Sequence, residues 1–183
     1  MPLPQLKAKL EYADLADTPD DGLRYEILDG ELYVTPSPRL THQRVSRRLQ
    51  RQLETYFAEP GVGEVFNAPA DVVLGRHDVV VPDLVVVTDA AQAADDRAIM
   101  GSPVLLVEFL SPSTARRDRT IKSRRYAEHG VPHYWIVDAT KQTIECYRLN
   151  ERQYELVASA KGSARMAHPD FPGLTIEPGV LWK

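Results

Sequence analysis

Residues 103–130 read PVLLVEFLSPSTARRDRTIKSRRYAEHG, and this stretch decides the fold. The apolar run VLLVEFL is typical of a buried strand, because such strands are short and nearly continuous in apolar residues. The segment SPST then predicts a turn and an N-cap, and the helix that follows is expected to run through Glu128 and to end at Gly130. A strand that leads directly into an amphipathic helix indicates a mixed α/β domain.

The sequence on both sides of this stretch extends the same pattern. The string RYEILDGELYV (24–34) alternates around Asp29-Gly30, which predicts an N-terminal β-hairpin. Apolar residues then recur at helical spacing over residues 40–57. We expect β-rich stretches at 64–73, 78–87, 133–139, 143–149 and 153–159, a helical or loose excursion at 89–100, and a coil tail through Trp182.

Length and composition favour one globular domain. The chain has 183 residues, of which 43% are hydrophobic and 26% charged, and neither a linker nor an internal repeat divides it, so a single domain over 1–183 is expected. No apolar run approaches the roughly 20 residues of a membrane span. The charged N-terminal segment does not resemble a secretory signal. A single cysteine, Cys146, excludes an internal disulfide, and a reducing cytoplasm fits.

The charge distribution is more informative than the net charge of −4. Residues 39–51 and 116–125 together hold 11 of the 22 basic side chains and one acid, Asp118, whereas the rest of the chain is strongly acidic. Two basic stretches on an acidic body favour local binding of a polyanion, although solvated helix faces would give the same pattern. The arginines that we expect to contact nucleic-acid phosphates are Arg44, Arg47, Arg48, Arg51, Arg116, Arg117 and Arg119.

Two carboxylates interrupt segments that should be apolar. Glu108 lies within the apolar run at 104–110, and Asp83 follows Pro82 inside the stretch 78–87. An ionised carboxylate is costly to bury unless it is paired, hydrogen-bonded or bound to a cation. Lys122 lies fourteen residues beyond Glu108 on the predicted helix, so an aspartate, a glutamate and a lysine can converge.

That convergence fits phosphodiester hydrolysis. Two carboxylates can hold a hard divalent cation, Mg²⁺ or Mn²⁺, while an ammonium group orients water and offsets negative charge. A catalytic zinc site is less favoured, because the five histidines lack HExxH spacing. The chain also has no GxxxxGK[ST], GxGxxG or GxSxG motif, which removes the commonest nucleotide-binding, dinucleotide-binding and serine-hydrolase classes.

Several weak motifs occur together in a specific order. They are RYEILDGELYVTPSPRLTHQRV, Pro82-Asp83-Leu84, VEFLSPST, the series Asp118, Lys122 and Tyr126, and GVPHYWIVDA. Over residues 24–149 this series resembles the Uma2 family, also called the DUF820 group of restriction-endonuclease-like proteins, within the PD-(D/E)xK nuclease superfamily. The resemblance implies a restriction-endonuclease-like core in which helices flank a central mixed β-sheet.

The resemblance also implies the roles of individual residues. Asp83 and Glu108 would be the metal ligands, with the backbone carbonyl of Phe109 as a further ligand. The usual lysine two residues after the glutamate is replaced by Leu110, and in this family it lies on the next helix, which makes Lys122 the candidate.

Two other positions are candidates for the same site. His42 shares the inner face of the helix at 40–57, and the resemblance places a histidine near the active site, although a structural hydrogen bond is the simpler interpretation. Glu26 and Glu31 of the hairpin are alternatives for an auxiliary acid, and Glu31 matches the family string better.

The sequence therefore predicts a metal-dependent endonuclease that acts on nucleic acid, most simply DNA, and that forms a homodimer. A homodimer would place two active sites on the two strands of a duplex. The main alternative is a binding module that keeps the nuclease fold without turnover, and a small-molecule phosphodiesterase is the third. Loss of cleavage on replacing Asp83 or Glu108 would separate the first from the second.

Overall fold

Strand β8 (Leu105–Phe109) lies inside a six-stranded mixed sheet in the computed structural model, which describes residues 8–94 and 96–183. The two strands beside it in the sheet lie within the β-rich stretches predicted at 78–87 and 133–139. Among the described strands of this sheet, β8 and β9 are the one parallel pair, and the helix that follows β8 makes the crossover between them. The sheet order is β11 (Gln153–Lys161), β10 (Thr143–Asn150), β9 (His133–Asp138), β8, β6 (Leu84–Val87) and β3 (Glu64–Asn67).

The N-terminal hairpin belongs to a second, five-stranded sheet. Asp29 and Gly30 both have positive φ (53° and 80°), the conformation that a two-residue hairpin turn requires, so the predicted hairpin is confirmed. The order of this sheet is β2 (Glu31–Thr35), β1 (Arg24–Leu28), β5 (Asp78–Val80), β4 (Val72–Gly75) and β7 (Ile99–Met100).

The stretch expected as one strand over 78–87 is divided between the two sheets. β5 pairs with β1 and β4, whereas β6 pairs with β3 and β8. The break falls at Pro82-Asp83, where proline has no N–H to donate to a sheet. The chain therefore leaves one sheet and enters the other at the aspartate.

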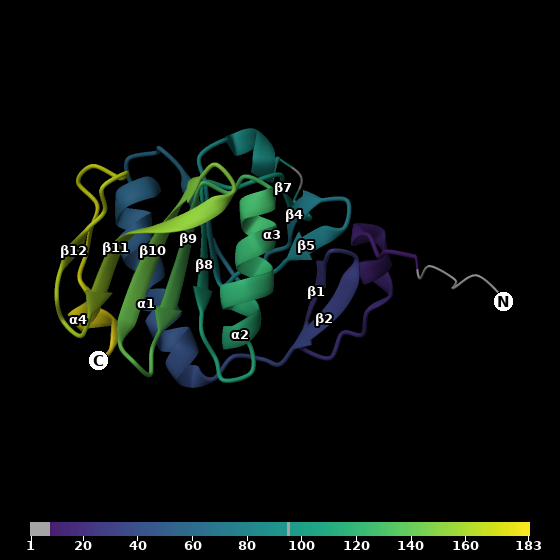
Figure 1. The fold of residues 1–183 in the computed structure, drawn as a ribbon, viewed down its shortest axis with the longest axis horizontal. Coiled ribbons are helices and arrows are strands. Elements are labelled where there is room, and N and C mark those ends of the chain that lie inside the picture. The colour runs from purple at the N-terminus through teal and green to yellow at the C-terminus, as the bar shows by residue number, and fades with distance from the viewer. Residues whose placement is uncertain (1–7, 95) are drawn as a thin grey trace.

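Helices cover both faces of the six-stranded sheet (Figure 1). The long helix α1 (Leu40–Phe57), predicted from its apolar spacing, packs through Val45, Leu49, Leu53 and Phe57 on one face. The opposite face is covered by a continuous helical segment: α2 (Ala115–Arg117), a π-helical turn (Asp118–Lys122) and α3 (Ser123–Glu128). Short 3-10 helices occupy Tyr12–Asp17 and Ala90–Ala93.

The C-terminal tail is more ordered than the coil that the sequence predicts. It forms a ribbon, β12 (Met166–Ala167) with β13 (Thr175–Ile176), and the short helix α4 (Pro178–Leu181). Met166, Ile176 and Leu181 are buried against the α1 face of the sheet. Burial of these scattered apolar residues explains the order, because their spacing has no helical or strand periodicity that a sequence pattern could use.

None of the helices within the described residues combines the length and apolar character needed to cross a membrane. Residues 1–7, on which the expectation about export partly rests, lie outside the described residues.

Asp78 of β5 connects three parts of the fold. Its buried carboxylate accepts hydrogen bonds from Arg125 of α3 (2.8 Å from Nε) and from the backbone N–H of Asp29 (3.0 Å), and it lies 3.0 Å from Nε2 of His129. Burial alone would raise the pKa of Asp78, but the hydrogen bonds from Arg125 and His129 outweigh it and hold the pKa well below the ordinary value.

We therefore expect Asp78→Asn to lower the free energy of unfolding at pH 7 by about 3–5 kcal/mol, as when one partner of a buried ion pair is removed. A folded-state pKa below the unfolded value of 3.8 stabilises the protein above that pH, and this contribution is lost as the pH falls below it. Urea unfolding at pH 7 and pH 3 measures both effects. Glu145→Gln, which breaks a more exposed pair with Arg119, is the control and should cost less than about 1 kcal/mol. An equal cost of Asp78→Asn at both pH values would contradict the prediction.

Candidate active site

A cavity of about 450 Å³ lies where the ends of several elements meet. Strand β1 contributes Arg24 and Glu26, the end of β8 contributes Glu108, and the π-helical turn contributes Asp118 and Lys122. The start of α1 and the segment before it close another side. Charged side chains from distant parts of the sequence therefore line one open pocket.

The pairing of β6 with β8 explains how two of the predicted residues come together. Leu84 pairs with Val107 in this antiparallel register, so the next position along places Asp83 opposite Glu108. Both side chains alternate onto the sheet face that α3 covers, and each residue is only 4% exposed. The two interruptions in the apolar pattern are thus neighbours in space.

Asp83 is surrounded by hydrogen-bond donors. Its Oδ1 accepts from Nη1 of Arg24 (2.7 Å), and its Oδ2 accepts from the backbone N–H of Phe109 (2.8 Å) and lies 3.0 Å from Nε2 of His42. Burial raises the pKa of Asp83, but His42 and Arg24 outweigh burial and lower it below the ordinary value. Asp83 is therefore a carboxylate at neutral pH.

Glu108 is held by one of its two oxygens. Oε1 accepts hydrogen bonds from Nζ of Lys122 (2.8 Å) and from the hydroxyl of Tyr126 (2.7 Å). Burial, with the added repulsion of Asp118 and Asp83, raises the pKa of Glu108 to about 8 against the opposing effect of Lys122. Within residues 8–94 and 96–183, no hydrogen bond to Oε2 is found, so this oxygen remains available to a ligand in the cavity.

Lys122 lies between two glutamates. Its ammonium is 2.6 Å from Oε1 of Glu26 as well as 2.8 Å from Glu108. Glu26 is in turn fixed by the backbone N–H of Val81 (3.0 Å). Burial alone would lower the pKa of Lys122, but Glu108, Glu26 and Asp118 outweigh it and raise the pKa above the ordinary value. The lysine is therefore a fixed, buried cation.

The helical segment after β8 contains the π-helical turn at this point. A π-turn inserts an extra residue into an α-helix and is frequent at functional sites. Here both Asp118 and Lys122, its first and last residues, are buried at the cavity. Burial raises the pKa of Asp118 above its ordinary value, although Lys122 and Thr114 act in the opposite direction. Asp118 thus adds a further acid to a site that has one lysine.

The donor set fits a hard divalent cation. Four acidic side chains, Glu26, Asp83, Glu108 and Asp118, are each at most 4% exposed in or beside this cavity. Such a concentration of buried acid is destabilised by mutual repulsion, which a divalent ion relieves. Oxygen donors are also those that Mg²⁺ and Mn²⁺ prefer.

The hairpin acid in the cavity is Glu26, which corrects the preference for Glu31. Glu31 begins the edge strand β2 beside the turn, where its side chain is exposed and outside the cavity lining. Glu26 pairs with Tyr33, farther from the turn, and is 1% exposed. Alternation could not separate the two acids, because Glu31 pairs with Leu28 and so lies on the same face of the hairpin as Glu26.

His42 points into the site, whereas the predicted arginines are dispersed. Arg117 lines the cavity and lies 3.5 Å from Glu26. Arg119 pairs with Glu145, and Arg48 donates to the carbonyl of Leu181. The remaining four, Arg44, Arg47, Arg51 and Arg116, are exposed.

Comparison with known proteins points in one direction. The Uma2 family, described as "Putative restriction endonuclease", matches residues 10–179. Among the curated proteins, the uncharacterized protein slr1290 of Synechocystis sp. (strain ATCC 27184 / PCC 6803 / Kazusa) is 27% identical over 162 residues, which are 87% of this chain and 84% of that protein.

A solved structure has a similar fold. It is the crystal structure of a putative nuclease belonging to DUF820 from Anabaena variabilis ATCC 29413, with a TM-score of 0.75 at 18% sequence identity. The similarity covers 94% of this chain and 97% of that chain. The predicted mixed sheet flanked by helices is therefore shared with a nuclease-like fold.

Proposed function

Because the chain belongs to the Uma2 family of restriction-endonuclease-like proteins, we propose that it is a metal-dependent nuclease that hydrolyses phosphodiester bonds in DNA. One observation carries the proposal. Asp83, directly before β6, lies opposite Glu108 of the paired strand β8, both line one cavity, and Lys122 lies 2.8 Å from Glu108. Two carboxyl groups and an ammonium that line one cavity are the groups that metal-assisted phosphodiester hydrolysis needs.

Asp83, Glu108 and the backbone carbonyl of Phe109 are the groups that would hold Mg²⁺ or Mn²⁺. Glu108 has Oε2 available, whereas Asp83 must exchange one of its contacts, most simply the one with Arg24. When bound, the ion would neutralise phosphate charge and activate water. Arg24, once released, is a guanidinium at the cavity wall that can bind a phosphate oxygen.

The raised pKa of Lys122 decides its role. A lysine that stays protonated at neutral pH donates hydrogen bonds and stabilises negative charge, but it does not remove a proton from water. Glu26 and Glu108 fix the position of its ammonium from two sides. Lys122 therefore orients the attacking water and stabilises the phosphoryl group in the transition state.

A basic path along α1 supports nucleic acid as the substrate. A hollow of about 290 Å³ beside Asp83 is lined by Arg24, His42 and Arg47. Arg47 also lines a second hollow, with Arg48 and Arg51, between α1 and the C-terminal tail. A phosphodiester backbone along this path would contact successive arginines, and its affinity should fall steeply with added salt.

The ion pair between Arg24 and Asp83 favours one alternative, a binding module without turnover. Both oxygens of Asp83 have protein partners, at 2.7 Å and 2.8 Å, so the cavity is charge-compensated in part without a metal. Such a protein would keep its affinity for DNA without cutting it.

Metal-dependent cleavage of supercoiled plasmid DNA tests the proposal. We expect nicked and linear products with Mg²⁺ or Mn²⁺, and loss of at least about 10³-fold in rate with EDTA, because the ion contributes several kcal/mol of transition-state stabilisation. Single-stranded RNA and bis(p-nitrophenyl) phosphate are assayed in parallel. Binding of DNA without cleavage under any divalent ion would support the alternative, and cleavage that persists in EDTA would reject the metal site.

A further inference from the structure

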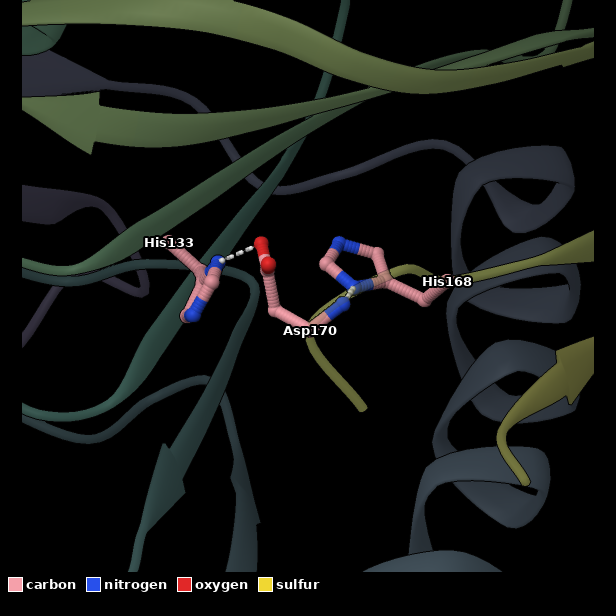
Figure 2. Close-up of side chains that lie close together, drawn as sticks. All are labelled: His133, His168 and Asp170. Carbon is pink, nitrogen blue, oxygen red and sulfur yellow. Dashed lines mark hydrogen bonds and ion pairs between the residues drawn. The ribbon is translucent and has the colours of Figure 1, made fainter. Parts of the chain in front are cut away.

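A second cluster of polar side chains lies outside the cavity, at the end of the sheet where the C-terminal tail begins. His133 is the first residue of β9, and His168 and Asp170 belong to the loop between β12 and β13. Figure 2 shows the carboxylate of Asp170 between the two imidazole rings. Residues from two distant parts of the sequence therefore meet at one point.

The distances in this cluster are those of potential metal ligands. One nitrogen from each imidazole and one carboxylate oxygen all lie within 4.8 Å of one another. Nδ1 of His133 is 3.9 Å from Oδ2 of Asp170, which is beyond a hydrogen bond. A metal ion between this nitrogen and this oxygen can contact both.

Each of the three side chains has one polar atom that is buried and unsatisfied. Within residues 8–94 and 96–183, Nδ1 of His133, Nε2 of His168 and Oδ2 of Asp170 are buried without a hydrogen-bond partner. The two histidines are 8% and 4% exposed. Leaving buried polar atoms unpaired is costly, so three such atoms on neighbouring side chains point to a missing ligand.

The surrounding contacts hold the three side chains in place. Arg148 donates to Oδ1 of Asp170 (2.8 Å), which leaves Oδ2 directed toward His133. The ring of His168 stacks on Trp135 at a centroid distance of 5.3 Å, and His133 packs on Phe171 at 4.6 Å.

The chemistry of the cluster differs from that of the nuclease cavity. Burial lowers the pKa of both histidines, that of His168 to about 4, so both rings are neutral at pH 7. Neutral imidazole is a ligand for Zn²⁺ and other late first-row metals, whereas Mg²⁺ prefers the all-oxygen donors of the cavity. Two imidazoles and one carboxylate form a common zinc ligand set, and water completes the tetrahedron.

We propose that His133, His168 and Asp170 form a zinc site that fastens the loop between β12 and β13 to strand β9. Ligand atoms of a tetrahedral zinc are about 3.4 Å apart, given bonds of about 2.0–2.1 Å, so the ion draws the three side chains together. Binding through Nε2 of His168 also requires the ring proton to move to Nδ1, which opens the 3.2 Å contact with the backbone N–H of Asp170. The site closes the tail over the core independently of the nuclease cavity.

Zinc and cobalt titrations of the purified full chain test this site in excess Mg²⁺, which occupies the oxygen-donor cavity. We expect one equivalent of Zn²⁺ per chain, a tetrahedral Co²⁺ spectrum in the visible range, and a higher unfolding temperature with zinc. His133→Gln and Asp170→Asn should each weaken zinc binding by at least about 100-fold. Loss of a residue that only supports a metal ligand already weakens binding by up to about 100-fold, and loss of a ligand should cost at least as much. His77→Gln is the matched control. The ring of His77 contacts the backbone carbonyl of Leu10 and is not part of this cluster, so the variant should bind zinc as the wild type does.

X-ray absorption of the zinc-loaded wild-type chain needs no variant, so it decides the matter even if a variant fails to fold. Scattering from two imidazole ligands supports the site. An oxygen-only shell, the absence of stoichiometric zinc binding, or zinc affinity unchanged in His133→Gln would overturn it. The same titration in Asp83→Asn should give the same zinc stoichiometry, whereas loss of zinc there would assign the ion to the nuclease cavity.

Discussion

Asp83→Asn is expected to lower the rate of metal-dependent DNA cleavage by at least about 10³-fold, while the affinity for DNA changes little. The change removes one of the two carboxylates that face each other across β6 and β8. Without it, the divalent ion loses a charged ligand, and a bound ion contributes several kcal/mol to such a reaction. Plasmid cleavage at saturating Mg²⁺, together with DNA binding measured by fluorescence anisotropy, gives both quantities.

The amide that replaces the carboxylate in this variant could also disturb the fold, because the native Asp83 accepts hydrogen bonds from Arg24 and Phe109. Asp78→Asn is the matched control. It makes the same chemical change at another buried, ion-paired aspartate that does not line the cavity. Rates are compared per folded molecule. If Asp83→Asn cleaves DNA as fast as Asp78→Asn does, Asp83 is not a ligand of the reaction's metal.

The sequence predicted the elements of this fold that have a regular apolar period. Helix α1 and the hairpin of β1 and β2 follow from spacing and from the Asp29-Gly30 turn. The sequence could not predict that β5 and β6 join different sheets, because an apolar pattern shows which residues are buried and not which sheet they join. The order of the C-terminal tail was missed for a related reason, since it depends on burial against α1.

The candidate site was predictable where a charge interrupts an apolar run. Asp83 and Glu108 both have this signal, and Lys122 follows from its place on the next helix. In contrast, Glu26 and Glu31 have similar sequence surroundings, and only the edge position of β2 separates them. The pair His133 and His168 had no signal at all, because the loop that brings them together has no motif with metal-ligand spacing.

Lys122→Met is expected to lower the free energy of unfolding of the metal-free protein by about 3–5 kcal/mol at pH 7. The ammonium contacts Glu26 and Glu108, so its removal leaves two buried acidic side chains without their cationic partner, which is the costly way to break a buried ion pair. Cleavage should also fall by about 10²–10³-fold, comparable to the loss of one donor to transition-state charge. Urea unfolding and the plasmid assay measure the two effects.

Two changes of condition should reduce the loss of unfolding free energy caused by Lys122→Met, because each reduces the unbalanced negative charge in the cavity. Mg²⁺ supplies the missing positive charge, so it should stabilise the variant more than the wild type. Lowering the pH from 9 to 7 should also narrow the difference, because Lys122 holds down the pKa of Glu108, which is about 8, and without the lysine this carboxyl takes up its proton at a higher pH. Lys141→Met, the same change at a side chain that is 74% exposed, should cost less than about 1 kcal/mol under every condition. A cost for Lys122→Met that is insensitive to both Mg²⁺ and pH would mean that the lysine acts through packing, and the cavity would then have no excess of negative charge for a metal ion to balance.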